Sequence, residues 1–161
     1  MIILVEALIG VILFTIIVVP GTLKDPLRAL SDYPEPIRKR CMELGVIEER
    51  EERFTVKDLI RKTLAVIVFV LLISFILKKV NKAETFLDGF RISYILWLII
   101  TWYDGLILDC LWFCHSKKVR IPGTEDMKEY QDYWFHIRQS LIGTAIGIPA
   151  CLFIGLVVTL I

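Results

Sequence analysis

The sequence predicts an all-α integral membrane protein, built as a four-helix bundle with short amphipathic helices on its cytoplasmic side. Hydrophobic residues make up 56% of the 161 residues, and soluble domains average only about 45–50%. The mean hydropathy is +0.65. The apolar residues are concentrated in four blocks, each close to the roughly 20 residues that cross a bilayer as a helix. Short connections between such helices favour a bundle.

The predicted spans cover about residues 2–20, 59–77, 92–113 and 140–161, within a single membrane domain of residues 1–161. We expect the first span to be retained rather than cleaved as a signal peptide. No basic residue precedes its apolar run, and no small-x-small cleavage site follows Pro20 and Gly21. The third span is the most polar of the four and contains two carboxylates, Asp104 and Asp109.

The charge distribution predicts the orientation in the membrane. Of the 19 Lys and Arg residues, fifteen lie in or beside the loops 21–58 and 114–139, and four lie in the loop 78–91. The positive-inside rule then predicts a multi-pass protein of the cell membrane with both termini outside and the two basic loops in the cytoplasm. The net charge is only +1, and the basic residues are dispersed among acids. No nucleic-acid partner is therefore expected.

Two short helices are predicted in the first cytoplasmic loop. Pro26 suits a first helical position. A second helix is expected over residues 34–44, with Ile37 and Cys41 on one side and Gly45 as its C-terminal stop. These helices either lie on the membrane surface and close the bundle, which we favour, or form a cap that docks a partner.

The second cytoplasmic loop is expected to hold one longer helix. Thr124 is predicted to cap it, and it should run without a break through Arg138 into the fourth span. Its apolar face follows helical spacing and consists of Met127, Tyr130, Trp134 and Ile137.

Small residues recur every fourth position in the last span, at Gly143, Gly147, Cys151 and Gly155. Such a face lets another helix approach closely. The partner is either a helix of the same chain, which we favour, or a second copy of the chain in a homodimer. The other expected partner is the lipid bilayer.

Three acids lie within the predicted spans: Glu6, Asp104 and Asp109. An Asp at the centre of a spanning helix costs about 2.5–3.5 kcal/mol on insertion scales, so such residues usually mark a functional site. Asp104 lies deepest, and Glu6 lies near the outer end, in a separate vestibule or partly wetted from outside. Asp104 and Asp109 are five residues apart, about 140° around an α-helix, and so should not form a pair on their own.

The predicted binding residues are these three acids together with Trp102, Tyr103, His115 and His136. His136 and the helix before the fourth span are expected to complete the site around Asp104 and Asp109. The alternative for each acid is a purely structural hydrogen bond to a neighbouring helix.

The sequence assigns no metal and no cofactor. Side chains suited to zinc could meet near the cytoplasmic ends of the last two spans, but their spacing matches no known ligand pattern. They are Asp109, Cys114, His115, Glu125, Asp126 and His136. The four cysteines indicate no disulfide framework. Cys110 and Cys114 are expected to serve in packing.

Three functions remain open from the sequence. The first is proton- or cation-coupled binding or transport at a polar intramembrane site around Asp104. The second is a membrane-embedded enzyme, metal-assisted or not, that acts on a lipid or its head group. The third is an accessory or scaffold membrane protein. Signatures of common hydrolases and of phosphate-binding loops are absent from the sequence.

Overall fold

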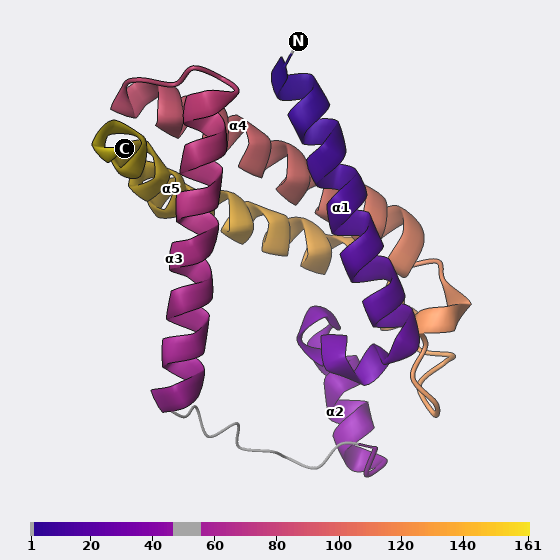
Figure 1. Ribbon diagram of the computed structural model, residues 1–161. Helices are drawn as coiled ribbons and strands as arrows, with labels where there is room; N and C mark the ends of the chain where they lie inside the picture. Colours follow the sequence, from indigo (N-terminus) through magenta and orange to yellow (C-terminus); the bar gives the residue numbers. More distant parts are fainter. Residues whose placement is uncertain (1, 47–55) are drawn as a thin grey trace. The chain divides into compact units, whose positions relative to one another are not determined.

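The computed structural model describes residues 2–46 and 56–161, without the side chains of residues 28, 29 and 58. This part of the chain is built from helices and contains no strand (Figure 1). The elements are α1 (Ile2–Lys24), the 3-10 helix η1 (Pro26–Asp32), α2 (Glu35–Glu43), α3 (Val56–Lys79), α4 (Phe86–Tyr103), the π-helix η2 (Asp104–Phe113), the 3-10 helices η3 (Lys117–Val119) and η4 (Lys128–Gln131), and α5 (Tyr133–Leu160). The predicted all-α class is confirmed.

Four helical segments among the described residues are long and apolar enough to cross a membrane, as expected of a multi-pass membrane protein. They are Ile2–Lys24, Leu59–Lys79, Phe86–Phe113 and Tyr133–Leu160. The third and fourth begin six and seven residues before the predicted starts at 92 and 140, because the helices continue through polar residues at their ends. The bundle arrangement and the orientation remain predictions. Residues 47–55 of the predicted first loop lie outside the described part.

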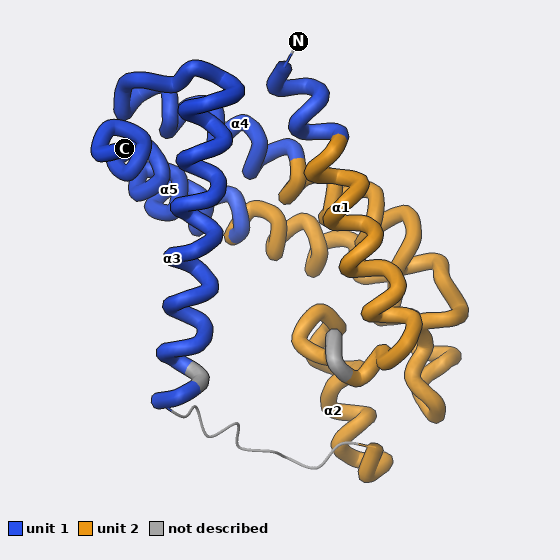
Figure 2. The backbone as a smooth tube through the Cα atoms, viewed as in Figure 1, with its two compact units in different colours: residues 1–8, 52–99, 143–161 blue, residues 9–51, 100–142 orange. Residues whose placement is uncertain are grey.

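The contacts divide the chain into two compact units (Figure 2). Unit 1 consists of residues 1–8, 52–99 and 143–161, and unit 2 of residues 9–51 and 100–142. The helices α1, α4 and α5 each contribute residues to both units. The prediction of a single membrane domain stays a prediction, and each unit is described by itself.

In unit 1, the small-residue face of α5 packs against α4 of the same chain. A side chain added at Gly147 would meet the indole of Trp97, and one added at Gly155 would meet the backbone of Phe86 and Phe90. The indole Nε1–H of Trp97 donates a hydrogen bond to the carbonyl of Gly143 at 3.0 Å. The missing side chains of these glycines therefore let α4 approach the α5 backbone closely enough for a direct hydrogen bond.

Unit 2 contains a core made mostly by its loops and short helices. Its buried members are Tyr33, Ile37, Cys41, Phe113, Val119, Ile121 and Tyr130. The hydroxyl of Tyr33 donates to the carbonyl of Val119 at 2.8 Å. Ile37 and Cys41 thus bury the apolar side of α2 against the chain itself, as their helical spacing predicted. Gly45 follows α2 with φ +66°, which is the left-handed stop that the sequence indicated.

The predicted helix over residues 124–138 is wrong in its first half. The Thr124 hydroxyl does not cap a helix: it donates to the carbonyl of Ile121 at 2.8 Å and lies 2.6 Å from the Tyr130 hydroxyl. Burial of Tyr130 holds this segment in turns and a short 3-10 helix. The helix α5 starts only at Tyr133, where the Asp132 carboxylate accepts the backbone N–H of Phe135 at 2.9 Å.

Candidate functional site

The third membrane-length helix changes its winding where its acids lie. From Asp104 to Phe113 it is a π-helix, in which each N–H bonds the carbonyl five residues back. The last such bond runs from the N–H of Cys114 to the carbonyl of Asp109 at 2.9 Å. A π-helix stacks residue i nearly over residue i+5, as an α-helix does for i+4. The expectation that Asp104 and Asp109 lie about 140° apart is therefore wrong, because it assumed α-helical winding.

The carboxylate of Asp109 contacts the imidazole of His136, at the start of the last span. Its Oδ2 lies 3.2 Å from Nδ1 of His136. The side chain of His136 is only 2% exposed and that of Asp109 is 26% exposed. The other ring nitrogen, Nε2, is buried and has no hydrogen-bond partner within the described residues. The rings of Phe113 and Phe135 pack edge-on against the imidazole, at centroid distances of 5.6 and 5.2 Å.

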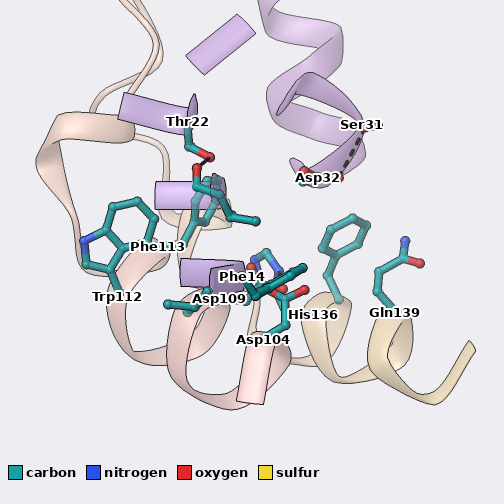
Figure 3. A pocket seen from close by; sticks show the side chains of 13 residues that line it. Phe14, Thr22, Ser31, Asp32, Asp104, Asp109, Trp112, Phe113, His136 and Gln139 are labelled. Carbon is teal, nitrogen blue, oxygen red and sulfur yellow. Dashed lines mark hydrogen bonds and ion pairs between the residues drawn. The ribbon is translucent and has the colours of Figure 1, made fainter. Parts of the chain in front are cut away.

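These side chains line a cavity of about 450 Å³ in unit 2 (Figure 3). Asp104, Asp109 and His136 all contribute to it, and their role in binding stays a prediction. The other lining residues come from α1, η1, η2 and α5, and they are Phe14, Val18, Thr22, Ser31, Asp32, Leu108, Trp112, Phe113, Phe135 and Gln139. The cavity thus combines three carboxylates and an imidazole with four aromatic rings.

Asp32 is the cavity residue that sequence reasoning missed. It ends η1 in a loop, outside every predicted span, so the cost of burying an acid in lipid did not single it out. Its neighbour Tyr33 is fully buried in the loop core, which fixes the position of Asp32. The side chain keeps an exposed surface, yet the protein around it partly desolvates the carboxyl and raises its pKa. The charge of Asp109 raises the pKa of Asp32 further, and that of His136 lowers it.

A second hollow of about 510 Å³ shares lining with the first. Val18, Thr22 and Asp32 line both hollows. Lys24 and Asp25 are among the residues that line the second hollow but not the first. The hydroxyl of Thr22 donates to the carbonyl of Val18 at 3.0 Å, which leaves its oxygen able to accept a hydrogen bond. Asp32 and Thr22 are therefore polar residues that border both hollows of unit 2.

Three further residues of unit 2 that were predicted to bind a ligand are not among the described residues that line the cavity. The hydroxyl of Tyr103 lies 2.9 Å from that of Thr15 and ties α4 to α1. His115 is exposed beyond the end of the π-helix, where its Nε2 lies 3.0 Å from the Tyr133 hydroxyl. Trp102 is partly buried. The helical stripe that placed His115 below Asp104 does not apply, because the helix ends at Phe113.

Glu6 belongs to unit 1, whereas the cavity belongs to unit 2. Its Oε2 accepts a hydrogen bond from the Asn81 amide at 2.8 Å. The structure therefore provides Glu6 with a partner in the segment that follows α3. A role for Glu6 in binding remains a prediction.

Metal and thiol chemistry find no support in this arrangement. Within the described residues, no three His, Cys, Asp or Glu side chains are grouped so that they could hold a metal ion. The four cysteines are free thiols, and all are buried. Burial raises the pKa of the Cys114 thiol to about 12, so this side chain stays protonated and inert at neutral pH.

Comparison of the chain with protein-family models, with curated proteins and with solved structures found no match. Any function must therefore be argued from the cavity itself.

Proposed function

We propose that the protein binds a proton or a cation in the unit 2 cavity. This binding would be coupled to movement of the bound proton or cation across or along the membrane. The observation that carries this proposal is the convergence of Asp104, Asp109 and His136 on one cavity within membrane-length helices. Helices in lipid rarely carry such groups unless they serve ions or protons. The contact between Asp109 and the buried His136 offers a site where a proton is held between a carboxylate and an imidazole.

Charge supports a cation rather than an anion. Asp32, Asp104 and Asp109 give the cavity up to three negative charges, and the imidazole of His136 is the one basic group among its described lining residues. Carboxylates confined by apolar walls concentrate cations by focusing the electric field. An anion would meet this repulsion, and no described lining residue offers a guanidinium or ammonium group to compensate for it.

The experiment is a flux measurement in vesicles that contain the purified protein and a trapped pH-sensitive dye. An imposed cation gradient should change the internal pH, and Asp104→Asn and Asp109→Asn should each slow that change at least tenfold. Asp126→Asn is the matched control, because Asp126 is exposed in the loop after η3 and does not line the cavity. Wild-type flux in both cavity variants would rule the proposal out.

A second function is favoured by the geometry of His136. An Asp that holds Nδ1 and leaves Nε2 free is the arrangement of a general base, which takes a proton from water or a hydroxyl group. The protein would then act as an enzyme on a lipid head group. Mass spectrometry of lipid vesicles incubated with the protein tests this function. Products that vanish with His136→Gln would support it, and unchanged lipids would exclude it.

A further inference from the structure

The aromatic rings of the cavity narrow the class of cation that it fits. Phe14, Trp112, Phe113 and Phe135 line the same cavity as the carboxylates. Protons and small metal ions are bound by oxygen and nitrogen atoms and gain nothing from a wall of rings. Organic cations gain from both groups, because ring faces attract positive charge and also cover hydrocarbon.

The size of the cavity agrees with an organic ligand. Its volume of about 450 Å³ lies within the range of roughly 300–1,000 Å³ that is usual for small-molecule sites. Such sites are mostly apolar, with a few polar groups that fix the orientation of the ligand. A bare ion would leave most of this volume unfilled.

His136 indicates what the ligand must offer. If the neutral ring carries its proton on Nδ1, as the contact with Asp109 requires, Nε2 is a hydrogen-bond acceptor. This buried acceptor has no partner among the described residues. Buried polar atoms without partners are rare in proteins, so a missing donor is expected here. The N–H of an ammonium group is such a donor, whereas a quaternary ammonium has none.

We propose that the cavity binds a protonated organic amine, whose ammonium group lies among the carboxylates and His136 and whose hydrocarbon part lies against the aromatic rings. This proposal rests on the proposed cation-binding function and names its ligand class. Among the described lining residues none is Lys or Arg, so none of them carries an ammonium or guanidinium group that would compete for the carboxylates.

The test is calorimetric titration of the purified full-length protein in detergent with three probes of similar shape. Benzylamine carries a charge and N–H donors, benzyltrimethylammonium carries only the charge, and benzyl alcohol is neutral. Benzylamine should bind, benzyltrimethylammonium at least tenfold more weakly, and benzyl alcohol not at the same concentrations. Equal binding of the alcohol, or no binding of benzylamine, would overturn the proposal.

Variants locate the binding. Asp109→Asn and Asp104→Asn should each weaken benzylamine binding at least tenfold, and Asp126→Asn should leave it unchanged. Two cavity variants are used so that one remains informative if the other fails to fold, which circular dichroism and gel filtration report. Benzylamine affinity that is unchanged in a folded cavity variant would place the amine elsewhere and refute the assignment.

The two proposals fail in different ways. Proton or inorganic-cation flux that depends on Asp104, without benzylamine binding, would leave the proposed function standing and remove the amine. The absence of both the flux and the amine binding would remove both proposals.

Discussion

Gly147→Ala should destabilise the protein, although alanine is normally preferred to glycine inside a helix. An added Cβ would lie against the indole of Trp97, whose Nε1–H bonds the carbonyl of Gly143. The better helix propensity of alanine contributes about 0.8–1.0 kcal/mol of stability. Overpacking costs about 1–3 kcal/mol, and displacing the indole from its hydrogen bond costs about 0.5–1.5 kcal/mol. The balance is a net loss of roughly 2 kcal/mol.

The assay is unfolding in mixed micelles by titration with sodium dodecyl sulfate, followed by circular dichroism. Gly21→Ala in α1 is the matched control, because no described heavy atom lies within 4 Å of a Cβ added there. It should be neutral or slightly stabilising. If Gly147→Ala is as stable as Gly21→Ala, the close approach of α4 to α5 at Trp97 would be refuted.

Three more predictions concern unit 2. Tyr130→Phe should lower the free energy of unfolding by about 1–3 kcal/mol, because the buried N–H of Ile121 loses its acceptor. The control is Tyr133→Phe, which removes a hydroxyl that contacts an exposed histidine and should change stability little in the same titration. Equal effects of the two substitutions would contradict the buried hydrogen bonds of Tyr130. Asp32 has a raised pKa and is charged only above it, so benzylamine binding should weaken as the pH falls through that pKa. Calorimetry over a pH series should show that this loss of affinity is missing in Asp32→Asn. The same pH dependence of affinity in the wild type and in Asp32→Asn would exclude a role for the charge of Asp32. Cys114, with a pKa of about 12, should resist N-ethylmaleimide near neutral pH until the protein is denatured; peptide mass spectrometry measures this, and rapid labelling of the folded protein would show that the thiol is not buried.

The secondary-structure elements were predictable wherever neighbouring residues along the chain determine the local backbone conformation. The apolar runs predicted the four membrane-length helices, and the small residues Gly143, Gly147 and Gly155 predicted a close helix contact. The backbone preferences of single residues predicted that Pro26 starts a helix and that Gly45 ends one. Pro26 does start η1, and Gly45 does follow α2. The ends of the spans were less predictable, because the helices continue beyond the apolar runs into polar residues.

The site was predictable only in part. The cost of an acid in lipid singled out Asp104 and Asp109, and His136 followed from its place before the last span. Asp32 could not be found in this way, because the tertiary burial of Tyr33 positions it. Thr124 was assigned to a helix cap because its local pattern is typical of one, and contacts with Tyr130 outweighed that pattern. His115 was placed by α-helical periodicity, which ends before it.

The π-helix makes the alignment of the two acids depend on the winding of the backbone rather than on composition. If the segment from Asp104 to Phe113 took up ordinary α-helical winding, its residues would be the same. The two acids would then lie five α-helical residues apart, about 140° around the helix, so one carboxylate would turn away from the other. The span would remain as hydrophobic as before. Homologues that share the hydropathy profile therefore need not share the cavity.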